Sequence, residues 1–331
     1  MKKTLVAVAA LAASAAFAQS SVTLYGVADA YFGSEKNVSP IPGAAGSQTV
    51  VNDGGLSQSR IGVSVKEDLG AGLSAFAVIE GAVALDGGAG GLGANRKSVV
   101  GLSGDFGAVS LGRQNTPLEN TIENTIDAQG NSAFSAVYAA VGGTAAAAGV
   151  TMNTYGNSVR YDSPNFDGFS GAVQLNFGEN KTPTTSAGRG VSLNLTYANG
   201  PVAVAFAHQS DKIGFGGTTD RTTTVGGSYD FGPAKLNLGY GRTTDVIGTN
   251  DGRALSVGVT VPVGAFTVIG QYANAKVSNI AGSSKSFGLE GRYALSKRTT
   301  VYAGYNDTKQ NIGGGANFKT NRLGVGIRHV F

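Results

Sequence analysis

The chain ends with the stretch Leu323-Gly324-Val325-Gly326-Ile327-Arg328-His329-Val330-Phe331. Successive side chains of a strand point to opposite faces, so Leu323, Val325, Ile327 and Phe331 share one face and the glycines and Arg328 share the other. The strand therefore separates an apolar face from a polar face up to its last residue. This pattern is typical of a wall between lipid and water, where the backbone groups must be paired within a closed sheet.

The first residues have the pattern of a secretory signal peptide. Lys2 and Lys3 precede an apolar run from Leu5 to Ala13, and Ala16-Phe17-Ala18 forms a small-x-small cleavage signature. A transmembrane helix needs about 20 apolar residues, and this run is shorter. We therefore predict residues 1–18 as a signal peptide and residues 19–331 as one exported domain.

Composition excludes several classes of function. The formal net charge is only +4, which gives no electrostatic argument for nucleic-acid binding. The chain has no Cys and only two His, so disulfides and thiolate metal sites are excluded, and we expect no metal site and no cofactor. The sequence His208-Gln209-Ser210-Asp211 contains the residue types of a catalytic triad, but neighbours in one strand point in alternating directions. We expect no enzymatic activity.

The hydrophobic pattern has a period of two along nearly all of the chain. Val191, Leu193 and Leu195, for example, alternate with Ser192, Asn194 and Thr196. The connections between these strands alternate between short turns and long polar stretches such as Ser34 to Gly55. This alternation is expected for an outer-membrane barrel, which has short turns on the periplasmic side and long loops on the outside. We predict an all-β fold, a 16-stranded antiparallel transmembrane β-barrel. The strands are predicted near residues 21–33, 56–67, 73–85, 96–103, 108–114, 157–163, 169–178, 190–198, 202–210, 222–231, 235–244, 253–261, 266–276, 284–295, 300–308 and 320–331.

A segment of about 40 residues, at 115–156, interrupts this rhythm. Pro117 suits the first turn of a helix, and Leu118, Ile122 and Ile126 recur at helical spacing. Structureless loops of this length are uncommon unless they are functional. We therefore predict that this third loop folds into the lumen and narrows the channel; the alternative is a loop on the surface.

Five segments carry a resemblance to a known family. They are Ser21–Ala30, Ser59–Leu73, Asn95–Gly104, Phe106–Gln114 and Val159–Pro164. Together with Phe331, their order and spacing resemble the trimeric general porins of Gram-negative bacteria, in the branch typical of betaproteobacteria. The resemblance covers the whole chain after the signal peptide.

This resemblance implies an outer-membrane homotrimer for the passive diffusion of small hydrophilic solutes and ions. It also implies contact with outer-membrane lipid, and recognition of the C-terminal strand, with Phe331 as the assembly signal, by the barrel-assembly machinery. A substrate-specific outer-membrane channel is the alternative, because it would share the fold, the signal peptide and the terminal Phe.

In this family, wall arginines face acidic residues of the third loop at the constriction. Carried over by motif, the arginines are Arg60, Arg96 and Arg160, and the acids are Glu119, Glu123 and Asp127. Alternation supports an inward Arg60 and Arg160, whereas Arg96 shares a face with Val100 and Leu102, so its inward placement rests on the resemblance.

Arg113 shares a face with Val109 and Leu111, which predicts a side chain that points outward or lies at a subunit contact unless the strand bends there. Fixed guanidinium groups in a narrow pore attract anions, so we expect a mild anion preference.

Overall fold

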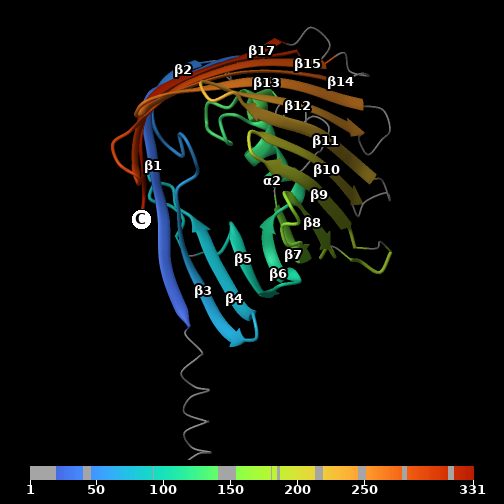
Figure 1. The fold of residues 1–331 in the computed structure, drawn as a ribbon. Coiled ribbons are helices and arrows are strands. Elements are labelled where there is room, and N and C mark those ends of the chain that lie inside the picture. Colours follow the sequence, from blue (N-terminus) through green and yellow to red (C-terminus); the bar gives the residue numbers. More distant parts are fainter. Residues whose placement is uncertain are drawn as a thin grey trace, which may run out of the picture.

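The computed structural model describes residues 20–39, 46–91, 93–140, 154–179, 181–184, 187–212, 219–244, 251–277, 282–311 and 317–331. The predicted signal peptide lies outside these ranges. The described chain forms a closed antiparallel β-barrel with a short helical segment inside it (Figure 1). No helix in these ranges has both the length and the apolar character needed to cross a membrane.

The strands are β1 (Ser21–Val38), β2 (Gly46–Asp53), β3 (Arg60–Gly70), β4 (Leu73–Ala82), β5 (Lys97–Gly104), β6 (Gly107–Asn115), β7 (Thr154–Asp162), β8 (Phe169–Asn176), β9 (Arg189–Asn199), β10 (Val202–Lys212), β11 (Thr219–Asp230), β12 (Lys235–Thr244), β13 (Asp251–Val263), β14 (Phe266–Val277), β15 (Gly282–Ala294), β16 (Thr299–Asn311) and β17 (Asn317–Val330). The barrel closes where β17 pairs with β1, from Val27 opposite Val330 to Val38 opposite Lys319.

These 17 strands occupy 16 positions in the wall, because β2 and β3 share one edge of β1. Strand β2 pairs with Ala30–Asn37 and β3 pairs with Ser21–Val27, so the two form one interrupted strand. The predicted 16-stranded barrel is confirmed. The long loop predicted over Ser34–Gly55 is wrong at both ends, since β1 continues to Val38 and β2 begins at Gly46.

The interruption between β2 and β3 is organised by Asp29, which is fully buried. Its carboxylate accepts hydrogen bonds from the backbone N–H groups of Gly55 (3.1 Å), Leu56 (2.8 Å) and Ser57 (2.8 Å), and from the Tyr302 hydroxyl. Backbone donors that lose a ladder partner must be satisfied elsewhere. The carboxylate therefore replaces the missing strand partner at this point of the wall.

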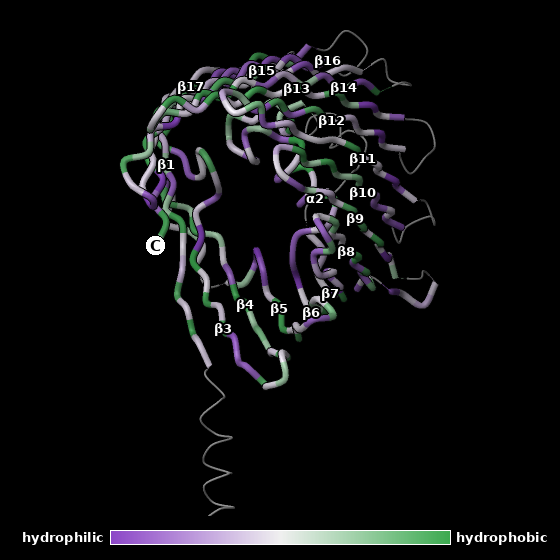
Figure 2. Tube along the Cα trace, in the orientation of Figure 1, coloured by the Kyte–Doolittle hydropathy of each residue, from purple (hydrophilic) through white to green (hydrophobic). Residues whose placement is uncertain are grey.

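Inward and outward positions alternate as the sequence predicts. Val225, Leu238, Leu255 and Phe287 are exposed on the outside, while their neighbours Thr224, Asn237, Ser256 and Ser286 are buried on the inside. Figure 2 shows this alternation along the strands of the upper wall. An apolar outer band around a polar interior is the arrangement of a transmembrane barrel.

The third loop begins after β6 and turns into the lumen (Figure 1). It contains α2 (Pro117–Thr121), which is capped by Thr116 and continues into the π-helical turn η1 (Ile122–Ile126). Leu118, Ile122 and Ile126 belong to one apolar cluster with wall residues of β10 and β14. The inward fold of this loop is confirmed for residues 117–140; residues 141–153 lie outside the described ranges.

Glycines on the inner wall make room for the loop. A Cβ atom at Gly239 of β12 would lie 2.2 Å from Ile126 Cγ2, and one at Gly304 of β16 would lie 2.2 Å from Phe134 Cδ2. A Cβ atom at Gly288 of β15 would likewise lie 2.4 Å from the Phe134 carbonyl oxygen. These positions exclude any larger side chain, because the loop backbone and side chains lie against the bare strands.

Candidate pore constriction

Polar wall side chains hold the loop against strands β12 and β15–β17. Glu290 accepts hydrogen bonds from Gln129 Nε2 (2.9 Å) and from the Ser132 hydroxyl. Asn237 Nδ2 donates to the Thr125 carbonyl (2.9 Å), and Asn306 Nδ2 donates to that of Phe134 (3.2 Å). Arg292 Nη2 donates to the Gln129 carbonyl (2.8 Å), and Arg322 Nη1 donates to the Ala133 carbonyl. The loop is thus fixed to one side of the bore.

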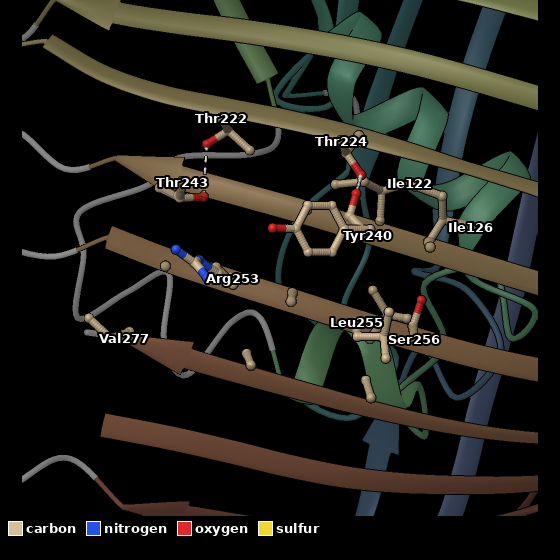
Figure 3. A pocket seen from close by; sticks show the side chains of 17 residues that line it. Ile122, Ile126, Thr222, Thr224, Tyr240, Thr243, Arg253, Leu255, Ser256 and Val277 are labelled. Atoms are coloured by element: carbon tan, nitrogen blue, oxygen red, sulfur yellow. Dashed lines mark hydrogen bonds between the residues drawn. The ribbon is translucent and has the colours of Figure 1, made fainter. Parts of the chain in front are cut away.

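A small apolar cavity of about 60 Å³ lies behind the loop (Figure 3). Ile122, Ile126 and Val137 line it from the loop side, and inner-wall residues of β13 and β14 such as Ser256 and Ala273 line it from the barrel. Its lining offers few polar groups, so it is part of the packing between loop and wall.

The opposite side of the loop faces an open polar cavity of about 570 Å³. Its charged lining residues are Asp53, Arg60, Arg96, Arg113, Glu119 and Glu123. The structure therefore brings four of the six predicted constriction residues, Arg60, Arg96, Glu119 and Glu123, to one opening between the loop and strands β3–β6.

Glu80 of β4 links the two wall arginines. Its carboxylate lies 2.8 Å from Arg96 Nε and 3.6 Å from Arg60 Nε, and it accepts a hydrogen bond from the Tyr25 hydroxyl (3.0 Å). Sequence reasoning missed this residue. A signal was present, because a single carboxylate in the otherwise apolar run of β4 marks a position that does not face lipid.

Arg96 lies just before β5, which begins at Lys97. The alternation that grouped Arg96 with Val100 and Leu102 therefore does not extend to it. Its backbone N–H donates to the Glu80 carbonyl (3.1 Å), which turns the residue toward the end of β4. This placement agrees with the family resemblance rather than with the strand pattern.

Arg113 lies at an irregularity of β6. The register of β6 with β7 shifts between Gly112 and Gln114, and Gly112 has a φ of 126°, a conformation open to glycine. Such a bulge redirects the side chain that it contains. Arg113 Nε donates to the Asn95 carbonyl (2.8 Å), and the residue borders the polar cavity. The strand bends here, which is the stated exception to the outward position that simple alternation predicts, and Arg113 faces the bore.

Arg160 faces a second opening of about 270 Å³ that shares Arg96 and Asn115 with the first. Its guanidinium binds Asp162 (Nε to Oδ2, 2.9 Å) and donates to the Asn115 carbonyl (2.9 Å). Lys97 lines the same opening. The two openings adjoin each other at Arg96 and Asn115, and together they are called the passage beside the loop.

The three loop acids differ in their surroundings. Burial raises the pKa of Glu119 to about 7, although the Tyr138 hydroxyl donates a hydrogen bond to it (2.7 Å). Burial also raises the pKa of Glu123, while the positive charges of Arg96 and Arg60 oppose this rise. The field of the wall arginines therefore reaches Glu123 across the passage.

Asp127 is used within the loop itself. Its carboxylate accepts hydrogen bonds from the backbone N–H of Gln129 (2.9 Å) and Asn131 (2.8 Å) and from the Ser135 hydroxyl (2.8 Å). Burial raises its pKa to about 6. These bonds hold the turn after η1, and the residues that line the two openings do not include Asp127.

The charges of the passage nearly balance. The basic residues are Arg60, Arg96, Lys97, Arg113 and Arg160, and the acidic residues are Asp53, Glu80, Glu119, Glu123 and Asp162. Because the pKa of Glu119 lies near 7, it carries only part of its charge at neutral pH. A small positive excess remains. In the described part of the chain, no group of three or more Asp, Glu or His side chains is arranged to hold a metal ion.

A closed barrel with an apolar outside, a polar bore and a loop that narrows this bore to a charged passage defines a channel protein of the outer membrane. The family described as "Gram-negative porin" matches residues 4–313. The chain belongs to this family and is an outer-membrane porin that forms a water-filled channel.

Individual relatives agree with this assignment. Outer membrane porin protein 32 of Delftia acidovorans is 35% identical over 360 aligned positions, which cover 100% of both chains. An outer membrane porin protein of Bordetella pertussis is 32% identical and is also fully covered. Among solved structures, an anion-selective porin from Comamonas acidovorans matches with a TM-score of 0.80 and 28% identity, covering 95% of this chain and 100% of that one.

Proposed function

We propose that the passage beside the third loop is the constriction of a general diffusion pore with a mild preference for anions. Arg60, Arg96 and Arg160 supply its positive side, as the sequence predicts, and Arg113 adds to it. Glu119 and Glu123 supply its negative side, and Asp127 maintains the loop that carries them. The observation that carries the proposal is the polar cavity lined by both sets of charges.

The mildness of the preference follows from the charge balance. Glu80 offsets much of the charge of Arg60 and Arg96, so the local excess is small. Guanidinium groups stay charged at any accessible pH, whereas Glu119 is partly protonated at neutral pH. The similar Comamonas porin is described as anion-selective, which supports the same sign here.

Single-channel recording in a planar bilayer under a potassium chloride gradient tests this proposal. The wild type should show a reversal potential that favours chloride, and the double variant Arg60→Ala, Arg96→Ala should lose this preference. Arg221→Ala is a matched control, because Arg221 is exposed on the outer face. A wild-type reversal potential that favours potassium would contradict the proposal.

We further infer a homotrimer without catalytic activity, exported by cleavage after residue 18. Residues 19–331 would then form the single mature domain. Phe331 pairs with Gly26 of β1 through two backbone hydrogen bonds (3.0 and 3.1 Å) at the edge where the barrel closes. This position suits a terminal signal that the barrel-assembly machinery recognises. Deletion of Phe331 should therefore lower the amount of folded protein in the outer membrane.

A further inference from the structure

Two large apolar side chains, Phe76 and Val78, lie on the inner face of β4 between Glu80 and the short turn that precedes the strand. Ile79 is 48% exposed on the outside, and Glu80 is buried on the inside. Because side chains alternate along a strand, Phe76 and Val78 face the bore together with Glu80. Both are half-buried, and neither lines the two openings of the passage. The channel function leaves them unexplained, since the interior of a water-filled barrel is polar.

Strand β5 continues this apolar surface. Val99 lies opposite Val78 and faces inward, because its neighbour Val100 is 57% exposed on the outside. Gly101 lies opposite Phe76, and a Cβ atom at Gly101 would lie 2.6 Å from Phe76 Cζ. The phenyl ring therefore extends along the wall over Gly101, where the glycine leaves room for it. We call Phe76, Val78 and Val99 the apolar patch.

The apolar patch does not seat the helical part of the third loop. The helical elements α2 and η1 pack against strands β8–β12, and β4 and β5 lie across the bore from β12 (Figure 1). The inward rings of Tyr31 and Tyr302, in contrast, contact the ring of Phe134 in the loop (5.4 and 6.5 Å between ring centroids). Those rings have a packing role, whereas the patch borders the water of the bore.

Two lysines flank the apolar patch. Lys97 is the inward residue next to Val99 on β5, and Lys66 lies opposite Phe76 on β3. Among the described residues, neither lysine forms an ion pair with a carboxylate. The wall thus offers positive charge without a bound counter-charge directly beside apolar surface. A ligand that complements it carries a negative charge and an apolar body.

The spacing along the strands sets the size of this ligand. A strand rises about 3.4 Å per residue, so Val78 lies about 7 Å from Glu80, which binds Arg60 and Arg96. Val99 lies two residues from Lys97 and hence at a similar distance from it. A phenyl ring that bears one carboxylate, or a branched alkyl chain of similar length, spans such a distance.

We propose that the apolar patch and the basic residues next to it form a binding site for amphiphilic carboxylates, in which one carboxylate is joined to a phenyl ring or a short branched chain. The carboxylate binds Lys97 and the guanidinium groups of Arg60 and Arg96, and the apolar body lies on Phe76 and Val78. This inference rests on the proposed function, because the ligand reaches the site through the passage. The site favours such anions over plain anions of the same charge.

Single-channel recording with added organic anions tests this proposal. Sodium benzoate and sodium acetate, added to potassium chloride, present the same carboxylate with and without a phenyl ring. Benzoate should reduce the chloride current at an at least about tenfold lower concentration than acetate, because contact with the patch removes one face of its ring from water. Benzyl alcohol has the ring without the carboxylate and should leave the current unchanged.

Three variants separate the two parts of the site. Phe76→Ser combined with Val78→Thr removes the exposed apolar surface and should bring benzoate to the level of acetate. Phe76→Leu keeps an apolar side chain and should retain most of the difference. Lys97→Gln should weaken both carboxylates and leave their ratio unchanged. In potassium chloride alone, the Phe76 and Val78 variants should have the conductance of the wild type, which verifies that they are folded.

The outcome is independent of the ion preference proposed above. A wild-type reversal potential that favours potassium would contradict that preference, whereas benzoate and acetate are compared at equal charge. The binding site is excluded if benzoate and acetate reduce the wild-type current at equal concentrations, or if benzyl alcohol acts as benzoate does. It is also excluded if the Phe76→Ser, Val78→Thr variant distinguishes the two carboxylates as strongly as the wild type does.

Discussion

Acidification should increase the anion preference of the pore, because Glu119 loses its charge near neutral pH. Its pKa is raised to about 7 by burial in the loop. A carboxyl group is ionised above its pKa and neutral below it, so this rise moves the loss of the Glu119 charge to near neutral pH. Between pH 8 and pH 6 the ionised fraction of Glu119 falls from about 90% to about 10%. The arginines keep their charge throughout, so the positive excess of the passage grows as the pH falls.

The size of the effect follows from the dimensions of the cavity. A sphere of the cavity volume, about 570 Å³, has a radius of about 5 Å. At this distance the Coulomb energy between the Glu119 charge and a permeating monovalent ion in water is about 0.8 kcal/mol. Screening in about 0.15 M salt reduces this energy to about 0.4 kcal/mol. Loss of the Glu119 charge stabilises an anion and destabilises a cation by this amount. The chloride-to-potassium permeability ratio should therefore rise about threefold between pH 8 and pH 6.

Reversal potentials measured at a series of pH values, with equal pH on both sides of the bilayer, check this expectation. Glu119→Gln is the matched variant, since its side-chain oxygen can still accept the bond from Tyr138. It should show the high ratio at every pH and a flattened titration between pH 6 and pH 8. A wild-type ratio that does not change over this interval, or a variant that titrates like the wild type, would refute the reasoning.

Two further predictions concern the wall. Asp29→Asn should lower the free energy of unfolding by about 2–4 kcal/mol, because three backbone donors lose an ionised acceptor. Thermal melting followed by circular dichroism measures this loss. Asp251→Asn, at the outer end of β13, should destabilise the barrel much less than Asp29→Asn, because a surface ion pair contributes little; equal melting temperatures for the two variants would exclude the proposed role of Asp29. Gly304→Ala places a Cβ atom 2.2 Å from Phe134 and should shift the loop and change the single-channel conductance, whereas Gly291→Ala, which opens onto free space, should not; identical conductances would contradict the seating of the loop.

The sequence is sufficient to predict the barrel because the alternation of apolar and polar residues within each strand indicates which face points to lipid. The outward residues Val225, Leu238 and Leu255 alternate with polar neighbours, and this local pattern needs no knowledge of distant contacts. The same reasoning fails at Arg96 and Arg113. One of them lies before its strand and the other lies at a bulge, so the period of two does not apply to either.

Contacts between distant parts of the chain could not be predicted from spacing. Glu290 binds Gln129 across 161 residues, and Tyr302 binds Asp29 across 273. Both acidic residues are inward by alternation, yet alternation does not identify their partners. The interruption between β2 and β3 was missed for this reason, since it depends on a carboxylate in the neighbouring strand.

The loop gives the two sides of the bore different tasks. On β11–β16, glycines such as Gly239 and Gly304 and hydrogen-bonding residues such as Glu290 seat the loop. On β3–β6, Arg60 and Arg96 face the open passage. The distance between the arginines and the loop acids is therefore set by contacts on the far wall, which hold no charge of the passage themselves. It follows that substitutions in the far wall can alter ion selectivity while every charged residue of the constriction remains unchanged.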